Sequence, residues 1–164
     1  MNKGEFCEFP EDNASEIIPN LWLGNYKSSC EKEFIVSKNI RHIIRVMPVL
    51  YNDTIFPDVK YVNIPIVDKE MCNKNLNELF DTLSDYIRDA LIKKKPVLIH
   101  CRRGHHRSAT VLVAFFIKYL KLDYFEIILY INKKRPCALR RNTCMVNGLL
   151  DYYMKCQNKV ITRS

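Results

Sequence analysis

The sequence contains no apolar run long enough to cross a membrane, which takes about 20 consecutive apolar residues. Its first residues include acids where a secretory signal would need an apolar segment. The cysteines form no CxxC pair and are odd in number and scattered, at positions 7, 30, 72, 101, 137, 144 and 156. This pattern argues against a zinc site or a disulfide scaffold and favours reduced thiols. We therefore expect a soluble, cytoplasmic protein.

Internal repeats, low-complexity segments and linkers are also missing. The chain has 164 residues, 48% hydrophobic and 27% charged, which is ordinary for one globular domain. Its formal net charge of +8 favours anionic partners such as phosphoproteins, phosphoinositides, nucleic acid or an acidic membrane surface. We expect a flexible N-terminal arm over residues 1–14, the folded domain over 15–157 and a C-terminal tail over 158–164.

The spacing of apolar residues predicts strands that alternate with helices. Strands are expected at 17–25, 40–47, 59–64 and 97–99, and helices at 28–38, 76–91, 108–120, 124–134 and 142–156. Residues 48–58 and 65–75 are expected to be loops. This order predicts an α/β fold with a central, partly parallel sheet and helices on both faces. In such folds, sites form where the strands end, so the 65–75 loop can face the loop after residue 99.

The most informative stretch runs from Val97 to Thr110. Its first three residues read as a buried strand, and a polar loop then leads into an apolar helix. Free backbone N–H groups gather at such a helix start and make it an anion site. Cys101 lies in this loop, and Arg107 follows six residues later. A thiol among N–H dipoles ionises easily, and a guanidinium offers a planar fork to phosphate. The stretch predicts a nucleophilic thiolate that attacks a phosphoryl group.

The alternative interpretation is a buried cysteine beside a basic surface loop. Polar neighbours on both sides of Cys101 argue against it, because burial would then need its own explanation. Gly104 also permits the backbone kink that a tight loop needs.

The segment from His100 to Ser108 resembles the phosphate-binding loop of the cysteine-based protein tyrosine phosphatase superfamily. Other segments are similar to signatures of its dual-specificity phosphatase branch: Leu21 to Asn25, Ile43 to Val46, Ile64 to Asp68, and Arg135-Pro136 with Asn142 and Leu149-Leu150. The resemblance extends from about Ile17 to Tyr153 and predicts that residues 15–157 form a compact catalytic domain.

The resemblance implies a mechanism through a cysteinyl-phosphate. Cys101 would be the nucleophile, Asp68 the general acid and base, and Ser108 a donor to the thiolate. His100 would orient the cysteine from behind. The phosphate-binding residues would be Arg102, Arg103, Gly104, His105, His106 and Arg107. Neither a metal nor another cofactor is implied.

Two features leave alternatives open. The segment after Asp68 looks longer than usual by two residues, within Met71 to Lys74, which makes Glu70 a rival general acid. Cys72, in the same segment, is a candidate resolving thiol for an oxidised Cys101.

The substrate is also open, because Arg102, Arg103, His105 and His106 stand where protein-directed members usually carry small or apolar residues. Either these side chains point outward while their backbones hold phosphate, or the pocket suits highly charged substrates. Phosphorylated proteins are favoured, with phosphoinositides and inositol polyphosphates or pyrophosphates as the alternative.

A five-prime RNA phosphatase is a weaker alternative, and no stable nucleic-acid binding is expected, because no aromatic series for base stacking is present. A catalytically silent module that binds phosphorylated ligands is the rival from another class. Arg45 replaces an asparagine that is usual in the second-strand signature. The basic run from Lys133 to Arg135, with Arg140 and Arg141, is expected to be a solvated face, with a docking surface for acidic partners as the alternative.

Overall fold

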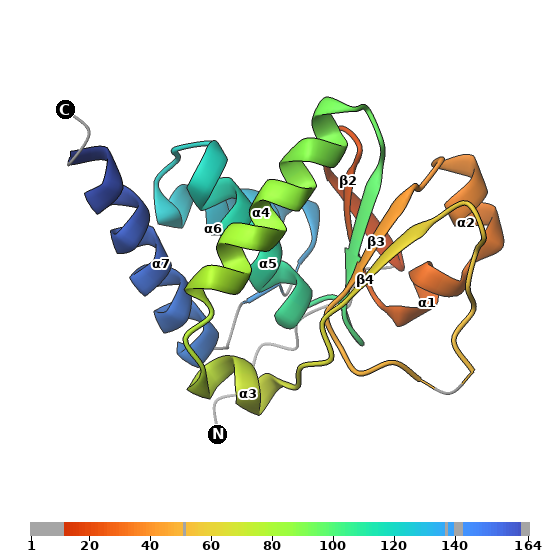
Figure 1. The fold of residues 1–164 in the computed structure, drawn as a ribbon, viewed down its shortest axis with the longest axis horizontal. Coiled ribbons are helices and arrows are strands. Elements are labelled where there is room, and N and C mark those ends of the chain that lie inside the picture. The colour runs from red at the N-terminus through yellow and green to blue at the C-terminus, as the bar shows by residue number, and fades with distance from the viewer. Residues whose placement is uncertain (1–11, 51, 137, 140–142, 162–164) are drawn as a thin grey trace, which may run out of the picture.

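A five-stranded sheet forms the centre of the molecule (Figure 1). The computed structural model describes residues 12–50, 52–136, 138–139 and 143–161. Across the sheet the order is β1 (Ala14–Ile18), β2 (Leu21–Gly24), β5 (Val97–His100), β3 (His42–Arg45) and β4 (Lys60–Asn63). β1 is antiparallel to β2, and the other neighbours are parallel. The predicted α/β class with a partly parallel sheet is confirmed.

Helices lie on both faces of this sheet, as predicted (Figure 1). On one face are α4 (Asn77–Ile92), α5 (Arg107–Tyr119) and α6 (Tyr124–Lys134), with α7 (Thr143–Ile161) packed on α5. On the other face are α1 (Tyr26–Cys30) and α2 (Lys32–Ser37).

The alternation of side chains along β5 explains the two layers. Val97 and Ile99 point into the larger core, which they share with α4 and α5. Leu98, between them, joins a smaller core with Ile35 of α2 and Ile43 of β3. Successive side chains of a strand point to opposite faces, so a wholly apolar strand must be covered on both sides.

The register of the parallel strands fixes where a site can form. Gly24, His100, Arg45 and Asn63 are paired across the sheet and end their strands at one edge. The segments that follow these four residues therefore start close together. This is the carboxyl edge, where the sequence places the candidate site.

Several boundaries differ from the prediction. The strand expected at 17–25 is a hairpin of β1 and β2, with Asn20 at φ 68° in its turn. The helix expected at 28–38 is two short helices, broken at Glu31. Asn25 caps the first by accepting a hydrogen bond from the Ser28 N–H. Helices this short depend on tertiary packing, which the local pattern does not reveal.

The ends of the domain also differ. Residues 12–14 of the expected arm are part of the fold, since β1 begins at Ala14 and the Asn13 carbonyl accepts from the Asn25 N–H. Residues 1–11 of the arm and 162–164 of the tail lie outside the described residues. α7 runs to Ile161, past the expected domain boundary. In the described part of the chain no helix combines the length and apolarity that a membrane crossing requires.

A further helix, α3 (Asp68–Asn73), occupies most of the expected 65–75 loop. Met71 of this helix is buried, and a disulfide joins Cys72 to Cys144 of α7, 5.2 Å apart between their Cα atoms. The expectation of reduced thiols is therefore wrong for this pair. The reason is tertiary, because the fold brings together two cysteines that are 72 residues apart in sequence.

Arg45, the departure from the usual asparagine, ends β3 in a buried ion pair. Its Nη1 lies 2.9 Å from Oδ2 of Asp53, and the two side chains are 1% and 4% exposed. The same carboxylate oxygen accepts from the Leu50 N–H at 2.8 Å. The pair therefore holds the β3–β4 loop against the sheet edge.

Removing one charge of this pair should destabilise the fold. Asp53→Asn leaves a buried guanidinium without its counter-charge and is expected to lower the free energy of unfolding by about 3–5 kcal/mol. Arg45→Met with Asp53→Leu removes both charges and should lie closer to wild type. Urea denaturation measures both. Lys74→Ala, which breaks the exposed Glu70–Lys74 pair, should cost less than about 1 kcal/mol. An Asp53→Asn cost no larger than this control would refute the anchoring role.

Candidate active site

Cys101 follows β5 at the carboxyl edge and is 3% exposed. Its Sγ accepts hydrogen bonds from the Gly104 N–H at 3.3 Å and from Oγ of the buried Ser108 at 3.1 Å. The loop ends where α5 begins, at Arg107. The first backbone N–H groups of this helix have no hydrogen-bond partner within it. The structure thus brings Cys101, Gly104 and Ser108 together around the sulfur.

Only a glycine fits at position 104, because of its backbone conformation and because there is no room for a side chain. Its φ of +70° lies in the left-handed region, which favours glycine. A Cβ atom there would lie 2.5 Å from the Gly24 carbonyl oxygen and 2.9 Å from Nη2 of Arg135. The loop is therefore closely packed against the end of β2.

The carbonyl oxygens of the loop accept hydrogen bonds from donors outside its centre. Those of Arg102, Arg103 and Gly104 accept from the Tyr26 N–H, Arg135 Nη2 and Arg135 Nε, respectively. The carbonyls that remain accept as follows: His100 from the Val46 N–H, Cys101 from His100 Nδ1, His105 from the Leu139 N–H and His106 from the Thr110 N–H. Every carbonyl from residue 100 to 106 thus has a donor outside the centre of the loop.

Arg135 corrects a sequence-based expectation. We predicted a solvated basic face, but Arg135 is 1% exposed and lies under the loop. Its remaining Nη1 donates to the Asp12 carbonyl and to Ser15 Oγ, both at 3.2 Å. The guanidinium therefore links the loop to the N-terminal strand. Arg135 lies in one of the segments that resemble the family's signatures. In the sequence, this was the only indication that Arg135 has a specific role.

Arg107 and Asp68 are in direct contact. Arg107 Nε lies 2.8 Å from Asp68 Oδ1, and Nη1 donates to the Ile66 carbonyl at 2.9 Å. Asp68 is the first residue of α3 and its side chain is 54% exposed. Arg107 thus holds the segment of Asp68 beside the cysteine loop.

Glu70, the rival carboxylate, is engaged elsewhere. Its Oε2 pairs with Lys74 Nζ at 2.7 Å, and Oε1 accepts weakly from the Val67 N–H at 3.4 Å. The hydrogen bond from Lys74 lowers the pKa of Glu70. The contacts therefore place Asp68 beside Arg107 and the cysteine loop, and hold Glu70 to Lys74 within its own segment.

Two loop histidines are buried and neutral. Burial lowers the pKa of His100 from 6.5 to about 4. Burial also lowers the pKa of His105 to about 4, helped by the positive charges of Arg135, His106 and Arg103. Neither ring therefore carries charge near pH 7. Among the described residues, no group of three or more His, Cys, Asp or Glu side chains is arranged to hold a metal ion.

The side chains of Arg102 and Arg103 are exposed. In the described part of the structure they form no ion pair with a carboxylate. Their backbones belong to the loop and their side chains are exposed, whereas His105 is buried and His106 is half-buried. The four basic residues therefore do not share one arrangement.

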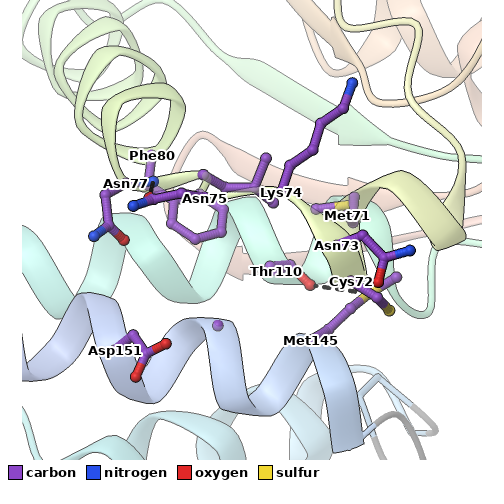
Figure 2. Close-up of a pocket in the computed structure, with 12 residues that line it drawn as sticks. Met71, Cys72, Asn73, Lys74, Asn75, Asn77, Phe80, Thr110, Met145 and Asp151 are labelled. Carbon is purple, nitrogen blue, oxygen red and sulfur yellow. Dashed lines mark hydrogen bonds between the residues drawn. The ribbon is translucent and has the colours of Figure 1, made fainter.

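Cys72 does not pair with Cys101. Figure 2 shows Cys72 of α3 beside Met145 of α7, at the wall of a cavity of about 270 Å³ that also reaches Phe80 and Asp151. Its sulfur is bonded to Cys144, while Cys101 is a free thiol in the loop. With its sulfur bonded to Cys144, Cys72 has no free thiol for Cys101 in this structure, and the resolving role stays a prediction.

The buried histidines should make stability depend on pH. The unfolded chain takes up these protons below about pH 6.5, but the folded chain does so only near pH 4, so the free energy of unfolding falls as the pH is lowered. Between about pH 7 and 5.5 we expect a loss of about 1 kcal/mol for each histidine. His105→Asn should therefore show a smaller loss in urea denaturation over this range. Equal slopes for the variant and wild type would contradict the assignment.

Several curated relatives of this chain are dual specificity protein phosphatases. Rat dual specificity protein phosphatase 18 is 28% identical over 148 residues, which cover 88% of this chain and 71% of that protein. Human dual specificity protein phosphatase 9 is 33% identical over 143 residues, 84% of this chain and 35% of that protein. Human dual specificity protein phosphatase 16 is covered over 21% of its length. The chain thus spans well under two thirds of the last two relatives.

Solved structures share the fold. Human DUSP28 superposes with a TM-score of 0.81 at 18% identity, over 91% of this chain and 98% of that one. The human tyrosine phosphatase-like serine/threonine/tyrosine-interacting protein gives 0.74 at 24% identity, over 92% and 98%. Identities this low support the architecture alone.

The sequence model of the family described as "Dual specificity phosphatase, catalytic domain" matches residues 21–155, which is most of the chain. This span includes the cysteine loop, Asp68 and all the parallel strands. The resemblance inferred from the sequence is confirmed, and the chain belongs to the dual-specificity phosphatase branch of the protein tyrosine phosphatase superfamily.

Proposed function

We propose that this protein is a cytoplasmic phosphatase that removes phosphate from phosphotyrosine and phosphoserine or phosphothreonine in proteins. One observation carries the proposal. The Cys101 sulfur accepts hydrogen bonds from a loop N–H and from Ser108, in a loop that ends at a helix N-terminus. These donors stabilise a thiolate, and N–H groups at a helix start attract a phosphoryl group.

In the first step the Cys101 thiolate attacks phosphorus. The bond from phosphorus to the leaving oxygen breaks as the sulfur–phosphorus bond forms, and Asp68 gives its proton to that oxygen. Arg107 and the loop N–H groups stabilise the charge on the transferring phosphoryl oxygens. The contact between Arg107 and Asp68 supports this assignment, because it places the acid beside the phosphate clamp.

In the second step water replaces the cysteine. The Asp68 carboxylate takes a proton from the water, whose oxygen attacks phosphorus. The sulfur–phosphorus bond breaks, inorganic phosphate leaves and the thiolate returns. The Ser108 hydroxyl, 3.1 Å from the sulfur, stabilises the departing thiolate through a charge-assisted hydrogen bond.

The second candidate function is a phosphoinositide or inositol polyphosphate phosphatase that uses the same chemistry. The outward arginines of the loop favour this candidate, since they add positive charge at the mouth of the site. The silent binding module has less support. Cys101, Arg107, Ser108 and Asp68 are all present, Ser108 contacts Cys101 and Arg107 contacts Asp68, and binding alone does not require a thiol with two donors.

A generic aryl phosphate tests the proposed chemistry. Wild type should hydrolyse it, and Cys101→Ser should lose essentially all turnover, because a serine hydroxyl is a far weaker nucleophile here. Cys156→Ser removes a free thiol outside the site and should retain activity. Phosphate release measures all three proteins. Hydrolysis that survives in Cys101→Ser, or none in wild type, would reject the enzyme assignment.

The role of Asp68 is tested by comparing substrates whose leaving groups differ in acidity. Asp68→Asn should reduce turnover of an alkyl phosphate or phosphopeptide by about 10²–10⁴-fold. It should affect an aryl phosphate with a very acidic leaving phenol much less, because that group departs without a proton. Glu70→Gln is the matched control and should leave both rates near wild type. Equal losses on both substrates would remove Asp68 from the acid role.

A further inference from the structure

Two cavities adjoin at the amino edge of the sheet, at the opposite end of β5 from Cys101. The first, of about 540 Å³, lies between α2 and the segment that precedes β4. The second, of about 530 Å³, lies where β3, β4 and β5 begin. Asn39, Arg41 and Asp58 line both cavities, which makes the two continuous neighbours. Volumes of this size are typical of small-molecule sites.

The second cavity is cationic. Its lining includes Arg41, Lys60, Lys94 and Lys95, and all four side chains are exposed. Among the described residues, none of these cations is paired with a carboxylate. The dipole of α4 favours lysines at its C-terminal end, which accounts for Lys94 and Lys95 but not for Lys60, the first residue of β4. Cations that gather without counter-charges attract an anion.

The histidine of the cationic cavity shows that these charges act on one place. His42 is buried, and its Nδ1 lies 2.6 Å from the Tyr86 hydroxyl. Burial lowers the pKa of His42, and the positive charges of Lys95, Lys60 and Lys93 lower it further. Lysines from the end of α4 and from the start of β4 therefore converge on this cavity.

The strand order spreads the cations over a width that exceeds one phosphate. The Arg41 N–H donates to the Pro96 carbonyl, and the Lys60 N–H donates to the Arg41 carbonyl, both at 2.9 Å. Lys95, Arg41 and Lys60 thus lie at the starts of three neighbouring segments, and neighbouring strands are about 4.8 Å apart. Such a row suits a ligand with several phosphates, because each cation can contact a different one.

The first cavity is largely apolar. Six of its ten lining residues are apolar, among them Ile35 and Val36 of α2 and Phe56 and Pro57 before β4. The Phe56 N–H donates to the Tyr61 hydroxyl at 3.0 Å, which holds this segment in place. An aromatic ring beside aliphatic side chains offers a surface on which a planar base can stack.

Polar groups stand where the apolar and the cationic cavity meet. Asp58 and Asn39 are exposed and line both. A carboxylate accepts hydrogen bonds from hydroxyl groups, and an amide both donates and accepts them. Carboxylates also bind ribose hydroxyls in dinucleotide sites. Asp58 would be unfavourable against a phosphate, but it suits a sugar that links an apolar group to phosphates.

We propose that the two cavities form a binding site for a nucleoside polyphosphate. The base lies in the apolar cavity, the ribose at Asn39 and Asp58, and the phosphates in the cationic cavity. The site is at the other edge of the sheet from the cysteine loop and does not depend on the proposed function.

ATP is the probe, and every protein in the test is the full chain with Cys101→Ser, so that the probe is not consumed. Titration calorimetry measures binding. Lys60→Gln with Lys95→Gln should weaken ATP binding by about 10–100-fold, because two charge-assisted contacts are lost. Lys121→Gln with Lys133→Gln removes the same charge from exposed positions elsewhere and should change binding less than about twofold. Equal losses in the two pairs would indicate attraction by net charge alone and overturn the proposal.

The base is tested with a second ligand, tripolyphosphate. Phe56→Leu keeps an apolar side chain but removes the ring, so it should weaken ATP binding about fivefold and leave tripolyphosphate binding unchanged. Unchanged ATP binding in this variant would refute the nucleotide assignment. Equal losses for both ligands would refute it as well.

His42 tests where ATP binds, because its ring lies in the cationic cavity. The NMR resonances of this ring should shift on addition of ATP, and Arg107→Ala should not change that shift. ATP binding that is lost with Arg107→Ala but retained with Lys60→Gln and Lys95→Gln would place ATP in the cysteine loop and overturn the proposal.

A short-chain phosphatidylinositol bisphosphate is the rival ligand that is both apolar and anionic. If it binds more tightly than ATP, and this binding depends on Phe56 and Lys60, the nucleotide assignment is overturned. No binding of ATP at all would refute the site, whether or not the wild-type protein hydrolyses phosphate esters.

Discussion

The site depends on one constraint. A loop whose N–H groups point toward an anion needs hydrogen-bond donors from elsewhere for its carbonyl oxygens. Buried carbonyls without donors are costly, so such a loop is stable only if the surrounding fold supplies those donors. Here the donors come from α1, from Val46 just after β3, from the segment after α6 and from the buried Arg135, together with α5 itself and His100. The left-handed Gly104 lets the loop close against the end of β2. The geometry around the Cys101 sulfur therefore depends on contacts from several distant elements of the fold.

The sheet brings the chemical groups within reach of this loop. Because β2, β5, β3 and β4 end in register, the segments after them start at one edge. The segment after β4 becomes α3 and presents Asp68 to Arg107. The segment after β3 is held by the Arg45–Asp53 pair, directly beside His100 in the sheet register. Burial keeps the His100 ring neutral, so this ring adds no positive charge beside the cysteine.

The two sides of the loop differ in chemistry. On the α3 side lies the carboxylate of Asp68, paired with Arg107, and on the α1 side lies a pocket of cations with no carboxylate among its lining residues. The basic residues between Cys101 and Arg107 therefore divide by burial. His105 is buried and neutral near pH 7, and His106 is half-buried with its pKa lowered by burial, while the two arginines are exposed.

The sequence alone determined the class of fold and the identity of the central residues. The periodicity of strands and helices can be recognised within a short stretch of sequence. The same holds for a cysteine loop between an apolar strand and an apolar helix. Tertiary structure decided what depends on distant partners. The Cys72–Cys144 disulfide joins positions 72 residues apart, Arg135 is buried because the loop needs its donors, and α3 is too short to form without packing. Tertiary contacts also decide which of the two carboxylates lies beside the phosphate clamp, since Asp68 pairs with Arg107 and Glu70 with Lys74. Whether Arg102 and Arg103 point into the catalytic pocket or out of it is likewise a matter of backbone direction, which the order of residues does not specify.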